Sequence, residues 1–208
     1  MTSYESFLPF VQPRVPTCPR ETCLHHIRQA AIEFCERTLV WQEDLDTLLA
    51  DGFSTSYALA LDDQVALSKL LEVWVQDSTT ARPVQYDTAT PAEGRDAERS
   101  GSTGNKAWMV DRATLGIWPA PIVDAAIDVT AALKPSQASY SFPEILFEHH
   151  ARQIAHGALA ELFDLGEWAD SMKAATERGK FEDAIAGAAR GAEKGNAKRR
   201  RCAAERFL

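Results

Sequence analysis

The hydrophobic pattern of this chain changes its period twice, and these changes limit the folds that it can adopt. From residue 19, and again from residue 143, apolar side chains recur every three or four positions, which is typical of helices with one buried face. Between these stretches apolar residues alternate with small or polar ones, as in half-buried strands. The 208 residues therefore predict an α+β fold, a helical bundle of an N-terminal helix and two C-terminal helices with an inserted β-rich segment.

The first and last helices have recognisable starting points. The first should begin at Pro19, because a helix leaves the N–H of its first position unpaired and proline lacks that N–H. Asp170 is a candidate N-cap for the last helix, which is rich in alanine and suited to close packing. Three sets of residues are each expected to lie on one face of a helix: Leu24, Ile27, Ala31, Phe34 and Thr38; Phe147, His150, Ile154, Ala158 and Leu162; and Met172, Ala175 and Gly179.

The middle of the chain predicts strands. Alternation is clearest over residues 53–61, 71–75 and 126–133, and residues 107–110 and 114–118 indicate a hairpin around residues 111–113. Residues 87–105 contain almost no apolar side chain. We expect them to form a long exposed loop, of a length that is usually functional or disordered.

These patterns divide the chain into four parts. They are an extended N-terminal arm (1–18), a helical domain (19–52 and 143–193), an inserted β-rich domain (53–142) that carries the exposed loop 87–105, and a basic tail (194–208).

Both ends of the chain are candidate partner-binding segments. The arm is rich in proline, which favours an extended conformation, and it carries four apolar anchors that a solvated arm would not need: Tyr4, Phe7, Leu8 and Phe10. Deletion of residues 1–16 is expected to leave a folded protein that no longer assembles. The tail has six basic residues against one acidic residue, a local charge of +5 that includes Arg199, Arg200 and Arg201, and it ends in Phe207 and Leu208. It could be a solvated end, dock on an acidic protein, or contact phosphates.

Composition and charge restrict the function classes. The net charge of −8 disfavours attraction of the whole molecule to nucleic acid or to an anionic membrane, although a basic patch remains possible. The sequence shows neither a secretory signal nor a membrane span, so we expect a protein made in the cytoplasm with reduced thiols.

The residues that could bind metal do not form a convincing set. Cys18, Cys23, His25 and His26 suggest zinc, but adjacent histidines on a helix point about 100° apart and rarely serve one ion. His149 and His156 are two helical turns apart, about 10 Å along the helix, which is too far for both to bind one ion. The acidic run of Glu43, Asp44 and Asp46 could hold a cation, although a solvated surface is commoner. No nucleophile, P-loop or dinucleotide motif is present, so we expect no enzymatic activity, no cofactor and no bound metal.

Several segments resemble, in the right order, the head-to-tail adaptor proteins of tailed bacteriophages. Residues 8–16 (LPFVQPRVP) resemble the family's extended LP-x-V-x-P-x-V-P stretch, and residues 30–35 (AAIEFC), followed by Trp41, resemble its Ala-Ala-x-x-Phe-Cys helix. Further matching segments are residues 71–75, 115–119, 133–136, 143–144 and 154–160. The family's Pro-Gly-rich turn before the last helix is replaced here by Leu165-Gly166-Glu167-Trp168.

The resemblance implies a structural virion protein at the head–tail interface. It implies a homo-oligomeric ring, typically of twelve copies, that binds the portal protein, extends the DNA channel and docks tail tube, nozzle or fibre proteins. Genomic DNA would pass through the lumen without sequence-specific binding, and no membrane is involved. The rival classes are a small DNA-binding protein that uses the basic C-terminal tail and a metal-dependent hydrolase that uses the histidines.

Overall fold

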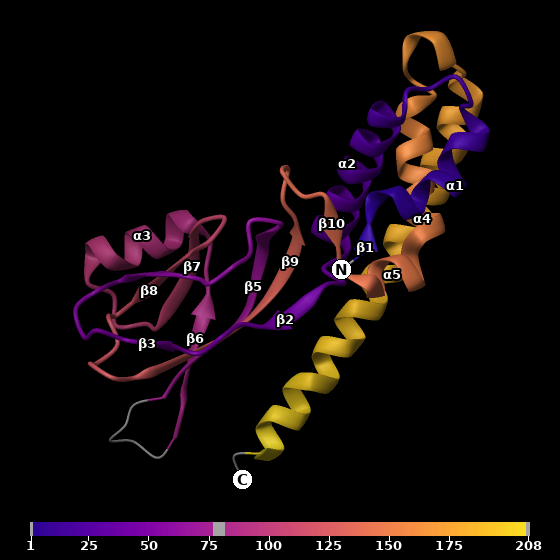
Figure 1. The fold of residues 1–208 in the computed structure, drawn as a ribbon. Helices are drawn as coiled ribbons and strands as arrows, with labels where there is room; N and C mark the ends of the chain where they lie inside the picture. The colour runs from indigo at the N-terminus through magenta and orange to yellow at the C-terminus, as the bar shows by residue number, and fades with distance from the viewer. Residues whose placement is uncertain (1, 77–81, 207–208) are drawn as a thin grey trace. The chain divides into compact units, whose positions relative to one another are not determined.

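The computed structural model describes residues 2–76 and 82–206, with side chains up to Glu193. It is a mixed α+β fold with a curled eight-stranded sheet and five helices, and 45% of it is helical. The chain forms two compact units. The helical unit is built mainly from Met1–Trp41 and Lys134–Ala203, and the sheet unit from Gln42–Asp62 and Ala66–Leu133 (Figure 1).

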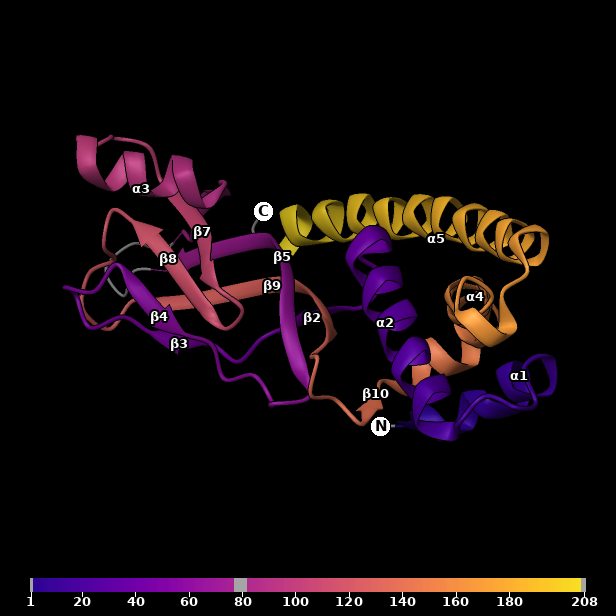
Figure 2. The same ribbon diagram turned by 90° about the horizontal axis from the view of Figure 1, so that it is seen from above.

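Three long helices make the helical unit: α2 (Arg20–Thr38), α4 (Glu144–Leu162) and α5 (Ser171–Arg206), with a short 3-10 turn, η3 (Gly166–Trp168), before α5 (Figure 2). Gly157 on α4 allows them to approach closely, because a Cβ atom there would lie 2.8 Å from the Phe181 ring on α5 and 3.0 Å from Ala30 on α2. The first helix ends where Leu39 takes a left-handed conformation and donates its N–H to the Cys35 carbonyl.

Several helical predictions are confirmed and one is wrong. Ile27, Ala31, Phe34 and Thr38 are buried as expected. Asp170 caps α5, since its Oδ1 accepts the Lys173 N–H at 3.1 Å. The buried face of α5 is displaced from the predicted one. It comprises Ala174, Glu177, Phe181 and Ile185, whereas Met172, Ala175 and Gly179 are exposed.

The N-terminal segment is not an extended arm. It forms β1 (Thr2–Ser3), η1 (Tyr4–Phe7), α1 (Leu8–Val11) and η2 (Gln12–Arg14), and β1 pairs with β10 (Ser141–Phe142). The prediction failed because Pro9 and Pro13 occupy first-turn positions, where proline initiates helical turns rather than preventing them.

The sheet unit contains eight strands: β2 (Gln42–Asp44), β3 (Leu48–Leu49), β4 (Ser56–Ala58), β5 (Val65–Gln76), β6 (Val84–Thr88), β7 (Lys106–Asp111), β8 (Thr114–Trp118) and β9 (Ala126–Pro135). Their order is β2-β9-β5-β6-β7-β8-β4, and β3 also pairs with β9. The predicted hairpin around residues 111–113 is confirmed as β7–β8, and the predicted strand at 126–133 is confirmed as β9.

The predicted helical bundle with an inserted segment is therefore wrong. Fewer than half of the residues are helical, and the sheet forms a compact unit of its own rather than an insertion into a helical bundle. The helical domain was also expected to continue to residue 52, but α2 ends at Thr38, and β2 and β3 follow, both paired with β9. Both strands are too short to reveal a period of two in the sequence, and the acidic residues Glu43 and Asp44 of β2 are exposed.

Residues 87–105 are not a long exposed loop either. They contain α3 (Pro91–Ser100), which connects β6 to the parallel strand β7. A capping box starts this helix: the Thr90 hydroxyl accepts the Glu93 N–H, and the Glu93 carboxylate accepts the Thr90 N–H. The helix packs on β7 and β8 with small residues, Gly94 and Ala97, so its sequence lacks an obvious apolar stripe.

Candidate partner-binding surfaces

Two of the four N-terminal anchor residues belong to the core of the helical unit. Phe7 is fully buried, with its ring centroid 4.9 Å from that of Phe142 and 5.4 Å from that of Phe147. Tyr4 is also buried. Its hydroxyl lies 2.8 Å from the Ser139 hydroxyl, and burial raises its pKa to about 12. Neither side chain can meet a partner without local unfolding.

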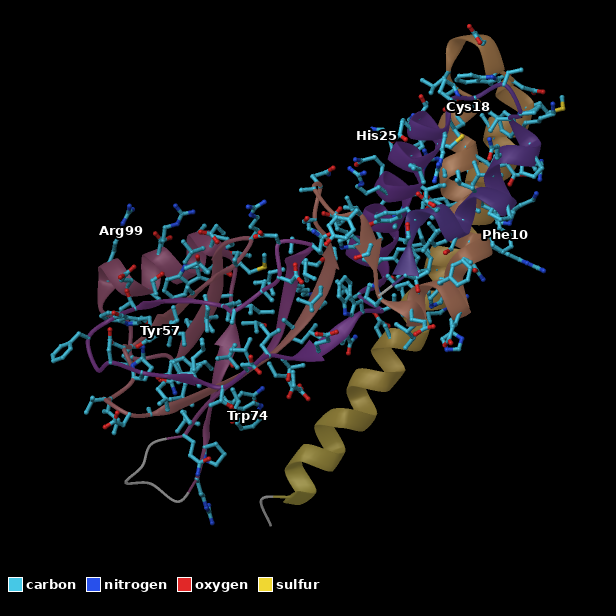
Figure 3. All side chains as sticks on the ribbon, in the orientation of Figure 1. Phe10, Cys18, His25, Tyr57, Trp74 and Arg99 are labelled. Atoms are coloured by element: carbon cyan, nitrogen blue, oxygen red, sulfur yellow. The ribbon has the colours of Figure 1, made fainter. Side chains whose placement is uncertain are left out.

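The other two anchors lie nearer the surface. Leu8 is half-buried. Phe10, which is labelled in Figure 3, is 37% exposed, and its ring centroid lies 6.4 Å from that of Phe147. Ile145, at the start of α4, is 54% exposed. Of the predicted anchor residues, Phe10 thus remains the best candidate for an external contact.

The basic tail continues α5, and only part of it can be described. The helix runs to Arg206, which places Arg199, Arg200 and Arg201 on it, but their side chains lie outside the described residues, as do Phe207 and Leu208 entirely. Before the tail, the last buried side chain of α5 is Ile185, and residues 186–193 are exposed or half-buried. A Cβ atom at Gly187 or Gly191 would meet nothing within 4 Å. Residues 186–193 therefore contribute no buried side chain to the helical unit.

The start of α5 is held by a buried carboxylate that sequence reasoning missed. Glu177, 1% exposed, accepts hydrogen bonds from Arg14 (3.1 Å) and Lys180 (2.8 Å), and its Oε2 lies 2.5 Å from His156 Nδ1. Burial alone would raise the pKa of Glu177, but the hydrogen bonds from Lys180 and His156, with their charges, outweigh it and hold the pKa below its ordinary value. The cluster ties η2, α4 and α5 together.

We predict that Glu177→Gln destabilises the helical unit by about 2 kcal/mol at pH 7, the usual loss for hydrogen bonds to a charged group. A carboxyl whose pKa is lower in the folded than in the unfolded state stabilises the fold above the unfolded pKa and loses that effect as pH falls. The difference in Tm between wild type and variant should therefore shrink from about pH 4.5 downward. Thermal unfolding from pH 7 to pH 3 measures it. Glu182→Gln, which breaks an exposed pair with Arg37, should cost less than about 1 kcal/mol. A pH-independent Tm difference for Glu177→Gln would contradict the assignment.

The sheet unit carries an exposed apolar cluster that the sequence did not indicate. We call it the apolar tip: Leu49, Phe53, Ile122 and Val123, with exposures of 70%, 90%, 47% and 58%. Two loops build it. They are joined by hydrogen bonds from the Ala50 N–H to the Ala125 carbonyl and from the Asp124 N–H to the Ala50 carbonyl. Exposed apolar clusters rimmed by polar residues are typical of protein-binding sites.

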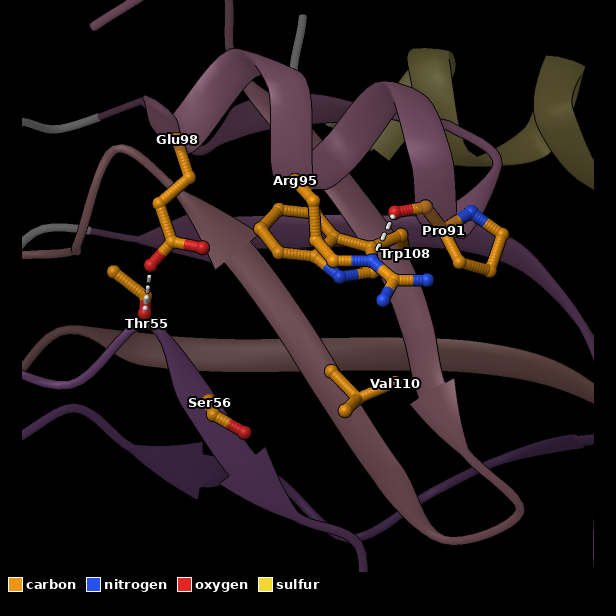
Figure 4. A pocket seen from close by; sticks show the side chains of 7 residues that line it. All are labelled: Thr55, Ser56, Pro91, Arg95, Glu98, Trp108 and Val110. Carbon is orange, nitrogen blue, oxygen red and sulfur yellow. Dashed lines mark hydrogen bonds between the residues drawn. The ribbon is translucent and has the colours of Figure 1, made fainter. Parts of the chain in front are cut away.

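A cavity of about 240 Å³ lies beside α3 in the same unit (Figure 4). Thr55, Ser56, Pro91, Arg95, Glu98, Trp108 and Val110 line it. The Trp108 ring lies between two glycines, because a Cβ atom would come within 2.1 Å of it at Gly94 and within 2.3 Å at Gly116. Glu98 accepts a hydrogen bond from the Thr55 hydroxyl at 2.9 Å.

The residues considered for metal binding do not converge. Among the described residues, no group of three or more histidine, cysteine, aspartate or glutamate side chains could hold an ion. Cys18 and Cys23 are buried thiols, and His26 pairs with Glu161 at 2.7 Å. His150 is half-buried against Phe34, and burial lowers its pKa. The described residues also include no helix that is both long and apolar enough to cross a membrane.

Comparison with known proteins does not assign the chain to a family. No protein-family model matches it, and no curated protein sequence does.

Proposed function

We propose that this protein is a structural subunit of a tailed-bacteriophage virion, a head-to-tail adaptor that forms a homo-oligomeric ring of about twelve copies beneath the portal protein. The ring would extend the DNA channel and dock tail proteins. The proposal starts from the ordered resemblance of the sequence segments. The fold is compatible with it, because the stretch at residues 8–16 packs on the helical unit that contains the two resembling helices, α2 and α4.

The exposed stretch of α5 at residues 186–193, which leads into the basic tail, is the observation that carries the proposal. An isolated helical segment is marginally stable in water, and Gly187 and Gly191 weaken it further. From residue 186 to residue 206 it spans about 30 Å, at 1.5 Å per residue. Because residues 186–193 bury no side chain and the helix continues beyond them, this part of α5 is expected to gain contacts from a partner. The +5 charge of residues 194–208 favours an acidic partner surface.

A closed ring needs two different contact faces on every subunit. The apolar tip supplies an apolar surface on the sheet unit, and α5 supplies a basic helical surface on the helical unit. With +5 in the tail, the remainder of the chain carries −13. A lumen lined by acidic surface would repel DNA phosphates and let the genome slide without sequence-specific contacts.

Replacement of Arg199, Arg200 and Arg201 by alanine should slow binding to purified portal about tenfold at low salt and flatten the salt dependence of the association rate. Removal of Phe207 and Leu208 should instead speed dissociation, because buried apolar anchors hold complexes together. Surface-based kinetics across salt concentrations measure both effects. The matched control replaces Arg82, Arg99 and Arg112, exposed residues of the sheet unit, and removes the same charge.

Binding to a DNA duplex is measured in parallel and separates the adaptor from the DNA-binding alternative. That alternative is favoured by the arginine run on α5, since arginine neutralises phosphates. The adaptor proposal predicts that portal binding depends on the three arginines and that the duplex binds no more tightly than non-specific background. Unchanged portal binding combined with a collapse of duplex binding would refute it.

A further inference from the structure

Strand β4 forms one end of the eight-stranded sheet, and within the part of the chain that the structure describes it pairs only with β8. It pairs with β8 in the register Ser56↔Gly116, Tyr57↔Leu115 and Ala58↔Thr114. On either side of Tyr57, the Thr55 carbonyl accepts the Ile117 N–H and the Leu59 N–H donates to the Ala113 carbonyl, both at 2.8 Å. Because backbone groups alternate in direction along a strand, Ser56 and Ala58 direct their N–H and C=O groups away from β8. These groups have no partner among the described residues.

The β4 edge also lacks the features that normally prevent pairing with another chain. Residues 55–60 (TSYALA) contain no charge and no proline. Strand β2, at the other end of the sheet, is Gln42-Glu43-Asp44 and carries two carboxylates. Natural sheets protect their edges with charges, prolines or bulges, so an unprotected edge in a sheet whose opposite edge is charged indicates a binding edge.

The cavity beside α3 adjoins this edge. Ser56, Gly116 and Trp108 are aligned across β4, β8 and β7, so their side-chain positions share one face of the sheet. The helix α3 packs on β7 and β8, and its residues Pro91, Arg95 and Glu98 overhang the cavity that Ser56 borders (Figure 4). The Ser56 side chain is exposed, as is the side chain of Val110.

The cavity contains a cation with unused hydrogen-bonding capacity. Arg95 donates from Nε to the Pro91 carbonyl at 3.0 Å, and its two terminal nitrogens have no partner among the described residues. Glu98 is already engaged by the Thr55 hydroxyl. The Trp108 ring, Pro91 and Val110 form the apolar part of the lining, which suits the aliphatic stem of a longer side chain.

We propose that β4 binds an extended segment of a partner protein as an additional strand, and that an acidic side chain of this segment enters the cavity and pairs with Arg95. An added strand lies about 4.8 Å from β4, so its residue opposite Ser56 projects on the face that bears the cavity. A guanidinium group binds a carboxylate through two parallel hydrogen bonds, and Arg95 has two terminal nitrogens to donate them. The cavity volume accommodates a glutamate side chain. The proposal concerns the sheet unit and stands independently of the adaptor function.

Three labelled peptides with the sequence Thr-Val-X-Val-Thr test the proposal, where X is glutamate, glutamine or lysine. Fluorescence anisotropy with the full-length protein should show that affinity falls from the glutamate peptide to the glutamine peptide to the lysine peptide. The affinities of the first two should differ at least about tenfold. Arg95→Gln should lower the affinity for the glutamate peptide to that for the glutamine peptide and leave the latter unchanged. Ala58→Pro should weaken all three about tenfold, because it removes an outward N–H without removing a bond to β8.

Hydrogen exchange supplies a readout that needs no variant. Binding of the glutamate peptide should slow exchange of the Ser56 and Ala58 amides at least about tenfold, while the Tyr57 amide, which faces β8, should change little. Equal affinities for the three peptides, binding without protection of Ser56 and Ala58, or protection caused by self-association of the protein in sedimentation experiments would each overturn the proposal.

Discussion

Replacement of Phe7 by alanine should lower the free energy of unfolding of the helical unit by about 3–5 kcal/mol. Phe7 is fully buried, and its ring packs against those of Phe142 and Phe147 at centroid distances of 4.9 and 5.4 Å. The variant loses the transfer free energy of the ring and leaves a cavity that the surrounding helices fill only in part. Urea unfolding followed by circular dichroism at 222 nm measures the effect, because the helical unit supplies most of the helical signal.

The matched control is Phe10→Ala, which makes the same chemical change three residues along. Phe10 is 37% exposed, so its replacement should cost no more than about 1 kcal/mol. The same reasoning revises the expectation for deletion of residues 1–16: the truncated protein should lose its folded helical unit, not only its ability to assemble. Equal losses of stability for the two phenylalanines would show that the N-terminal segment is not part of the core.

Replacement of Gly94 by alanine should destabilise the sheet unit by about 2–3 kcal/mol, although alanine is ordinarily the better helix former by about 1 kcal/mol. The added methyl group would lie 2.1 Å from Trp108 Cδ2, in a site where the ring is confined on its other face by Gly116. Either α3 shifts outward or the indole leaves its position, and both lose packing against β7 and β8. Thermal unfolding followed by tryptophan fluorescence reports on this ring directly.

Gly179→Ala on α5 is the control for intrinsic helix propensity. A Cβ atom there meets nothing within 4 Å, so this substitution should stabilise the protein by up to about 1 kcal/mol. The two substitutions are therefore expected to change the free energy of unfolding in opposite directions. Stabilisation by Gly94→Ala would mean that α3 does not pack on Trp108 as described.

Sequence patterns correctly predicted the elements whose pattern is contained in one continuous segment of the chain. The buried stripe of α2, the cap at Asp170 and the β7–β8 hairpin each rest on spacing within a single segment. Helix α3 was missed although its start, Thr90-Pro91-Ala92-Glu93, forms a capping box, because the segment around it contains few apolar residues. The apolar content is low because α3 buries Gly94 beneath the Trp108 ring, a contact between segments that no local period reveals.

The candidate binding residues were harder to predict for a related reason. An apolar residue near a chain end satisfies the same pattern whether it packs inside its own fold, as Tyr4 and Phe7 do, or against a partner. The apolar tip brings together residues about 70 positions apart through the backbone pairing of Ala50 with Ala125. The cavity is lined by residues of β4, α3 and β7 and by Thr55, which precedes β4. Such sites become visible only after the register of the sheet is known.

The most direct test of the adaptor proposal is the mass and shape of the complex formed with portal. Purified protein is mixed with the portal ring encoded in the same genome and analysed by mass photometry and cryo-electron microscopy. The proposal predicts one discrete complex in which a closed ring, with as many copies as the portal has subunits, covers one end of the portal. Portal particles that keep their original mass and shape in excess protein, with the added protein found only as free molecules, would contradict it.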